Sequence, residues 1–163
     1  MGTAKKKGFS LIEILVVLGI IGIISSFITP KIMFYMARGK ETKVISTLES
    51  LRTASEIYFM ETGNSLMSSE SYGNITRKEI KILEDYLSDN VSFLIKDILS
   101  DTTPVKMEIG GSKTSKTGDI TYGGEIRFTT KAPEGKTADG IKIWIDGEGV
   151  GAYSMNGDKW TDL

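Results

Sequence analysis

Three hydrophobic patterns follow one another along this chain. Residues 9–29 are apolar almost without interruption, residues 31–62 place apolar side chains at three- and four-residue steps, and several segments after residue 104 alternate apolar and polar positions. The first pattern is typical of a membrane-spanning helix, the second of an amphipathic helix and the third of β-strands. The pattern therefore predicts a long N-terminal helix followed by a sheet.

The apolar segment from Phe9 to Thr29 would be about 31 Å long as a helix, enough to cross the hydrocarbon core of a bilayer. Lys5 to Lys7 precede it, and the positive-inside rule places that end in the cytoplasm and the rest of the chain outside. The alternative is a secretory signal peptide, which has a shorter apolar stretch and an A-x-A-like cleavage site. Residues 28–31 (ITPK) offer no such site, so we expect a single-pass segment in the cytoplasmic membrane.

The apolar segment contains one carboxylate, Glu13. An acidic side chain in mid-membrane costs about 2.5–3.5 kcal/mol on insertion scales, so it usually has a partner. Cutting the chain after Gly8 would create an amine on Phe9, four residues before Glu13, and the N-terminal end of the helix dipole also favours a carboxylate. The amine can belong to the same chain or to a neighbour in an assembly. The alternative is a first-turn charge satisfied by its own terminus.

These residues resemble a known signal. The stretch 8–13 (GFSLIE), preceded by three lysines, is similar to the class III signal of type IV pilins and type II secretion pseudopilins. The resemblance implies that a prepilin peptidase cuts after Gly8 and N-methylates Phe9. It also implies that Glu13 docks a subunit into a growing filament by pairing with the Phe9 amine of a neighbour.

The resemblance covers roughly residues 3–63. Pro30 matches the proline that follows the apolar run in the family, and residues 58–63 match the end of its long helix. Gly19 and Gly22 weaken a helix, and Pro30 lacks a backbone donor. We therefore expect the helix to bend or loosen over residues 22–30, as the family's filaments do; an ordinary kink is the alternative.

The predicted fold class is α+β, and the resemblance implies the pilin fold, in which a long N-terminal helix packs on an antiparallel sheet. The expected divisions are a cleaved leader (1–8), a transmembrane and assembly helix (9–30), its amphipathic half (31–63), an αβ-loop with a short helix (64–104) and the sheet with C-terminal loops (105–163). Gly63 is the expected C-cap of the long helix. Thr76 and Glu79 have capping-box spacing, predicting a helix that continues to about residue 88. Strands are expected at 105–109, 125–129 and 141–145, whereas 91–99 is ambiguous.

The composition excludes several functions. Cysteine and histidine are both absent, which rules out disulfides, Cys/His zinc sites and imidazole catalysis. The net charge of −1 gives no basic signature for nucleic-acid binding. No motif of a nucleophilic or phosphate-binding site is present, so we expect no enzyme activity and no cofactor.

Calcium is the one metal considered. Asp146, Glu148 and Asp158 lie in glycine-containing loops near the C-terminus, where oxygen ligands suit Ca²⁺ and where, by resemblance, major pseudopilins carry such a site. The spacing is not that of an EF-hand. Asp-Gly and Asn-Gly pairs are also ordinary hairpin turns, which we favour.

The predicted function is a structural subunit of a type IV pilus-like filament, either a pilin or a major-type pseudopilin. By resemblance, its partners are further copies of itself, related pilin-like subunits, a prepilin peptidase, an assembly ATPase and a membrane platform protein. It would reside in the cytoplasmic membrane as a precursor and outside the cell membrane, or on the cell surface, after assembly. The alternative is a monomeric, membrane-anchored extracytoplasmic binding domain that uses the same export signal.

Overall fold

The structure is a computed structural model that describes residues 8–88, 91, 94 and 100–163. The chain divides into two compact units, an N-terminal unit (Met1–Met36) and a C-terminal unit (Ala37–Leu163). Both contain part of one helix, α1 (Leu11–Thr62). The predicted leader lysines, and most of the ambiguous stretch 91–99, lie outside the described residues.

Helix α1 ends at the predicted glycine. Gly63 has a φ of 72°, a left-handed conformation that glycine adopts without a steric penalty. Its N–H donates to the Phe59 carbonyl at 2.8 Å, which satisfies one of the carbonyls that a helix end leaves open. The predicted C-cap is confirmed.

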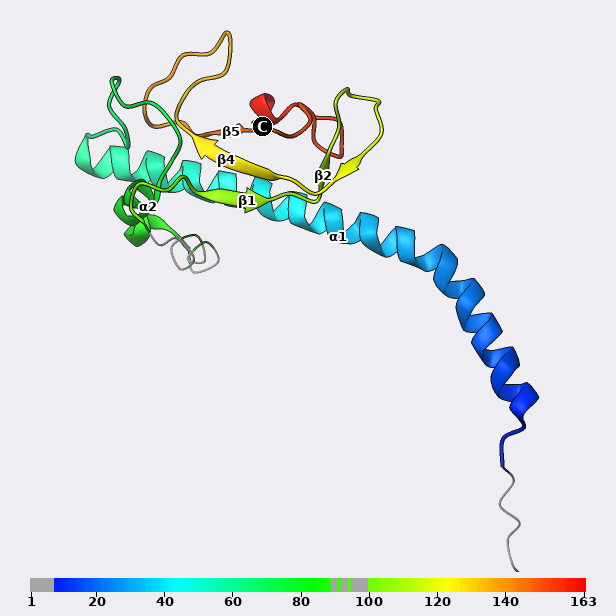
Figure 1. Ribbon diagram of the computed structural model, residues 1–163. Coiled ribbons are helices and arrows are strands. Elements are labelled where there is room, and N and C mark those ends of the chain that lie inside the picture. The colour runs from blue at the N-terminus through cyan, green and yellow to red at the C-terminus, as the bar shows by residue number, and fades with distance from the viewer. Residues whose placement is uncertain (1–7, 89–90, 92–93, 95–99) are drawn as a thin grey trace, which may run out of the picture. The chain divides into compact units, whose positions relative to one another are not determined.

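The C-terminal unit contains two small antiparallel sheets (Figure 1). In the larger sheet, β4 (Glu125–Thr129) lies between β1 (Lys106–Glu108) and β5 (Trp144–Asp146). Met107 pairs with Ile126, and Phe128 pairs with Ile145. The smaller sheet pairs β2 (Gly111–Ser112) with β3 (Thr121–Tyr122). The α+β fold class is confirmed: a long N-terminal apolar helix is combined with antiparallel sheets.

The core of the C-terminal unit lies between one face of α1 and the larger sheet. Figure 1 shows the C-terminal half of α1 running alongside β1 and β4. The helix contributes side chains at helical spacing, and the sheet contributes alternate positions of its strands. The fully buried members include Val44, Leu48, Leu51, Ile126 and Phe128. The amphipathic half of the helix therefore covers the sheet, as its pattern predicts.

The second helix is shorter than predicted. Helix α2 spans Arg77–Ile82 and is followed by a 3-10 turn, η1 (Glu84–Tyr86). The Thr76 N–H donates to the Glu79 carboxylate at 2.9 Å, and the capping box is confirmed. The backbone tightens at Leu83, whose N–H lies 3.3 Å from Glu79 O and 3.1 Å from Ile80 O. This shared hydrogen bond marks the change from α-helix to 3-10 geometry.

The third predicted strand is displaced toward the C-terminus. Of the predicted 141–145 region only residues 144 and 145 pair with β4, and the strand extends one residue beyond it to Asp146. Side chains of α1 bind the preceding carbonyls instead: Arg52 Nε donates to Ile143 O at 2.8 Å, and the Ser55 hydroxyl donates to Ile141 O at 2.7 Å. Because side chains of the helix already donate to these carbonyls, residues 141–143 do not pair with β4. A short 3-10 turn, η3 (Trp160–Asp162), follows near the C-terminus.

Candidate functional site

The residues expected at the processing site precede α1. Gly8, Phe9 and Ser10 have no helical assignment and are exposed, and the Phe9 side chain is 82% exposed. A protease binds its substrate as an extended backbone, which a helix cannot offer without unwinding. The geometry at Gly8 and Phe9 is thus compatible with cleavage, and the cleavage site stays a prediction.

Glu13 takes part in capping its own helix. Its carboxylate accepts the N–H of Ser10 at 3.3 Å, and the Ser10 carbonyl accepts the N–H groups of Glu13 and Ile14 at 3.1 and 3.3 Å. The reasoning from sequence missed this pairing. The sequence does contain the capping-box spacing that predicts it, because Ser10 and Glu13 are three residues apart, as are Thr76 and Glu79.

This capping contact is weak. At 3.3 Å it is long for a hydrogen bond to a carboxylate, and it uses only one oxygen of an exposed side chain. The carboxylate therefore keeps capacity for a further, intermolecular donor. The docking role of Glu13 and its pairing with Phe9 stay predictions.

The residues expected to bend the helix lie within an uninterrupted α1. The helix assignment continues through Gly19, Gly22 and Pro30. A Cβ added at either glycine would meet nothing within 4 Å, so no contact within the described chain requires these two residues to be small. Small residues of this kind allow helices of different molecules to approach closely. The bend stays a prediction.

Hydroxyl groups near Pro30 bond back to the helix. Ser26 donates to Ile23 O at 2.7 Å, and Thr29 donates to Ser25 O at 2.8 Å. Such bonds satisfy hydroxyl groups inside an apolar segment and are often found where helices bend. Because proline has no N–H, the Ser26 carbonyl also loses its usual helical donor.

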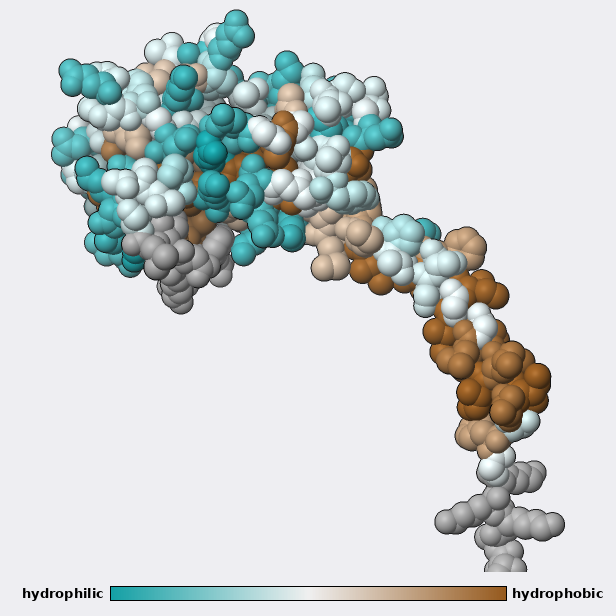
Figure 2. All heavy atoms as spheres, in the orientation of Figure 1, coloured by the Kyte–Doolittle hydropathy of each residue, from teal (hydrophilic) through white to brown (hydrophobic). Residues whose placement is uncertain are grey.

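The N-terminal unit exposes a continuous apolar surface. Figure 2 shows hydrophobic residues covering this part of the helix. Leu18, Ile23 and Phe27 are 63%, 64% and 72% exposed. Within the described residues, α1 is the one helix long and apolar enough to cross a membrane, judged by length and composition. Nothing within this unit buries these side chains, so they can be covered only by lipid or by another protein surface.

The calcium candidates form turns in the structure. Asp146 accepts the N–H of Glu148 at 3.1 Å, and the Glu148 carboxylate pairs with Arg127 at 2.6 Å. The Asp158 backbone is bonded to Ser154 in both directions. No group of three acidic side chains suited to a metal occurs in the described part of the chain. The favoured turn geometry is present, and calcium binding stays a prediction.

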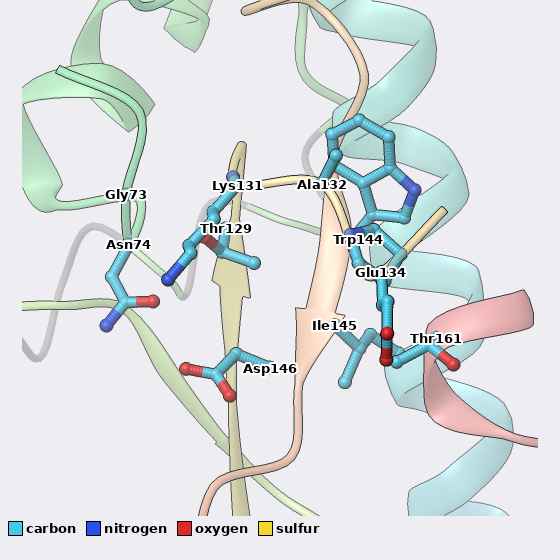
Figure 3. Close-up of a pocket in the computed structure, with 11 residues that line it drawn as sticks. Gly73, Asn74, Thr129, Lys131, Ala132, Glu134, Trp144, Ile145, Asp146 and Thr161 are labelled. Atoms are coloured by element: carbon cyan, nitrogen blue, oxygen red, sulfur yellow. The ribbon is translucent and has the colours of Figure 1, made fainter. Parts of the chain in front are cut away.

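A pocket of about 470 Å³ lies beside β4 and β5. Figure 3 shows Glu134 next to Thr161, whereas Asp146 lies toward Asn74. Trp144 lines the pocket, and its buried indole nitrogen has no hydrogen-bond partner. The charged residues on its walls are Lys131, Glu134 and Asp146.

Comparison with known proteins finds a family match in the N-terminal segment. A family model described as the prokaryotic N-terminal methylation motif matches residues 3–29. A fimbrial protein of Pseudomonas aeruginosa is 36% identical over 84 residues, covering 52% of this chain and 53% of that protein. The type IV major pilin protein PilA of Myxococcus xanthus is 35% identical over 57 residues, covering 35% of this chain and 26% of that protein.

A secretion-system protein is also similar. The type II secretion system core protein G of Escherichia coli K12 is 34% identical over 59 residues, covering 36% of this chain and 41% of that protein. The chain spans about half or less of the length of these relatives. No solved structure gives a significant match. The N-terminal methylation motif and these fimbrial and secretion-system relatives support the chain's resemblance to type IV pilins and pseudopilins.

Proposed function

We propose that this protein is a structural subunit of a type IV pilus-like filament, assembled through the N-terminal part of α1. The observation that carries the proposal is the exposed apolar surface of the N-terminal unit, most of which lies within the methylation motif. Burying apolar surface is favourable by roughly 25 cal/mol per Å². An unpartnered helix of this kind therefore associates strongly with lipid or with other copies of itself.

Two processing steps precede assembly in this proposal. A prepilin peptidase cuts after Gly8 and methylates the new amine of Phe9, which the exposed, non-helical backbone at these residues allows. The new positive charge then lies near Glu13 of a neighbouring subunit. An assembly ATPase and a membrane platform protein act on the chain as partners, and the subunit itself performs no catalysis.

Glu13 sets the register of neighbouring subunits in the proposed filament. Within the described residues its carboxylate accepts the long hydrogen bond from Ser10, and it can exchange that donor for a charged amine. An ion pair in a low-dielectric environment is far stronger than one in water. A subunit placed in another register would leave the carboxylate buried and unpaired, at a cost of several kcal/mol.

The decisive experiment substitutes Glu13→Ala in cells that carry the assembly machinery. We expect the variant to insert and fold but to be missing from the sheared filament fraction, as measured by immunoblotting. Glu56→Ala is the matched control, because Glu56 is an exposed carboxylate on the same helix in the C-terminal unit. Filaments formed normally by Glu13→Ala would refute the docking role.

Processing is tested separately by mass spectrometry of the purified mature protein. The expected N-terminus is Phe9 carrying one methyl group, and Gly8→Val should leave the leader attached. Gly39→Val is the control, because a side chain at Gly39 meets nothing within 4 Å. If the mature protein begins elsewhere, the proposed cleavage site is wrong. A chain that stays monomeric despite correct processing would favour the anchored binding domain.

A further inference from the structure

The exposed apolar surface of the N-terminal unit extends beyond residues 9–29, where the sequence is apolar almost without interruption. Ile32, Met33, Tyr35 and Met36 follow Pro30 and Lys31, and their exposed fractions are 51%, 55%, 69% and 65%. Ala37, the first residue of the C-terminal unit, is only 5% exposed. The unpartnered surface therefore ends at Met36, six residues later than a membrane segment ending at Pro30 would require.

The N-terminal boundary of the membrane segment also lies further toward the C-terminus than Phe9. Helix α1 begins at Leu11, and residues 8–10 have no helical assignment. Backbone N–H and C=O groups left without a hydrogen bond cannot lie in hydrocarbon without a cost of several kcal/mol each. The Ser10 backbone is bonded to Glu13 and Ile14, whereas the Phe9 backbone makes no hydrogen bond within the described residues. Phe9 therefore belongs in the aqueous or headgroup region. The charge of Glu13, near the start of α1, favours the same boundary.

The thickness of a bilayer relates the two ends of the membrane segment. The hydrocarbon core of a bilayer is about 30 Å thick, which takes up about 20 helical residues. Counted from the residue after Glu13, this length reaches Met33. Counted from Phe9, it reaches only Ile28, which would place non-helical backbone and a carboxylate in hydrocarbon and leave the apolar residues 32–36 in water.

The composition beyond Met33 suits a lipid headgroup layer. Tyrosine concentrates at membrane interfaces, where its ring lies among the acyl chains and its hydroxyl in water. Phe34 and Tyr35 pack edge to face with their ring centroids 5.9 Å apart. Lys31 is exposed, and its long stem can carry the ammonium group outward to lipid phosphates.

We propose that, in the membrane-anchored precursor, the bilayer takes up residues 14–33. Phe34, Tyr35 and Met36 then form an interfacial collar in the outer headgroup layer, and Lys31 reaches outward to lipid phosphates. The inference rests on the proposed membrane-anchored state, and it shifts the embedded segment by about five residues from a span that starts at Phe9. In this register Glu13 lies at the inner boundary, where a carboxylate costs much less than at the bilayer centre.

The absence of cysteine from the chain allows a direct test. Single-cysteine variants of the full-length, uncut protein are reconstituted in vesicles of phosphatidylcholine and phosphatidylglycerol, then made permeable to a water-soluble maleimide. Ser10→Cys and Met33→Cys are the discriminating variants. Ile21→Cys is a control within both alternative spans, and Gly39→Cys is a control on an exposed helix position in the C-terminal unit.

We expect Ser10→Cys to react at a rate close to that of Gly39→Cys. Met33→Cys should react at least about tenfold more slowly, like Ile21→Cys, because only the thiolate in water is reactive. A protected Ser10→Cys with a reactive Met33→Cys would overturn the proposed register while leaving membrane anchoring intact. Rapid reaction at Ile21→Cys would show that the segment is not embedded, and would contradict the anchored precursor itself.

The collar is tested in the same vesicles. Replacing Tyr35 by serine removes its ring, and the Tyr35→Ser change should raise the labelling rate of Met33→Cys several-fold, because the interfacial anchor is lost. Tyr122→Ser is the matched control, since Tyr122 is an exposed tyrosine of the C-terminal unit. An unchanged labelling rate at Met33→Cys would refute the collar.

Discussion

One helix supplies two surfaces with opposite relations to water. Up to Met36, α1 exposes nearly all of its large apolar side chains, whereas from Ala37 onward it buries Val44, Leu48 and Leu51 completely. The later stretch gains its stability from the sheet that it covers. The earlier stretch has no such partner within its unit, so its apolar side chains need cover from a surface outside that unit.

The largest expected difference between the two stretches comes from leucine truncation. Leu48→Ala should lower the free energy of unfolding of the C-terminal unit by about 2–5 kcal/mol, because it leaves a cavity in the core. Leu18→Ala, its counterpart in the N-terminal unit, should leave that value unchanged. Urea unfolding of the full chain in detergent measures both, with the buried Trp144 and Trp160 as fluorescent reporters. Equal losses for the two variants would contradict the independence of the units.

Glycine substitutions separate the two stretches in a second way. A Cβ at Gly110 would lie 2.0 Å from the Ala37 carbonyl oxygen, so Gly110→Ala forces the backbone apart. We expect a loss of about 1–3 kcal/mol, typical of overpacking. Gly22→Ala has free space around it and should leave the unfolding of the C-terminal unit unaltered, while filament yield falls if Gly22 lies at a subunit contact. A stable Gly110→Ala variant in the same urea titration would disprove the close approach.

Two of the glutamates of α1, Glu13 and Glu41, offer a third contrast. Glu41 is 2% exposed, and its carboxylate accepts the Met155 N–H at 3.1 Å. Glu41→Ala should cost about 1–3 kcal/mol, because the amide is left buried without a partner, whereas Glu41→Gln retains an acceptor and should cost less. Glu13→Ala should not change this stability. Thermal unfolding of the three variants, followed by circular dichroism, provides the measurement, and an unaffected Glu41→Ala would show that the bond contributes nothing.

The smallest expected effect concerns an exposed ion pair of the C-terminal unit. Lys40 lies 2.8 Å from Glu108, and its hydrogen bond and charge lower the pKa of the Glu108 carboxyl below its usual value. Lys40→Met should raise that pKa toward the ordinary value, as measured by an NMR titration. Lys142→Met is the control, at an exposed lysine that is not the partner of Glu108, and it should not change this pKa.

The pH dependence has a defined sign. A carboxyl whose pKa is lower in the folded state stabilises the protein above its unfolded pKa, and the contribution disappears as the pH falls through the folded value. The stability difference between wild type and Lys40→Met should therefore shrink in acid, and it should shrink with added salt because the pair is exposed. A difference that grows in acid would contradict the ion pair.

Much of this fold could be predicted because its signals are local. The strand at residues 125–129 alternates and lies at the centre of the sheet, so pattern and pairing agree. Gly63 and the capping box at Thr76 depend only on residues within one helical turn. The displaced β5 could not be predicted, because the carbonyls before it are bound by Arg52 and Ser55, about 90 residues earlier in the chain.

In the candidate site, too, the local features could be predicted from the sequence, whereas the feature that depends on the fold could not. The motif around Gly8 and the charge of Glu13 are contiguous features, so sequence alone was enough to find them. The hydrogen bond from the Ser10 N–H to the Glu13 carboxylate is also local, and the Ser10-x-x-Glu13 spacing could have predicted it. The end of the apolar surface at Met36 depends on where the C-terminal unit begins to bury the helix, which requires the fold.

The hydrogen bonds from α1 to the C-terminal residues have a mechanical consequence. Glu41 accepts a hydrogen bond from the Met155 N–H, and the Ser55 hydroxyl donates to the Ile141 carbonyl. Arg52 donates to the carbonyls of Ile143 and Leu163, the latter at 2.5 Å. Tension applied along this part of the helix would shear these bonds together, so that each carries only a share of the load. A strand unzipped from its edge would instead lose its bonds one at a time. Residues 141–163 are thus bonded to the helix in an arrangement that shares a load applied along the helix axis.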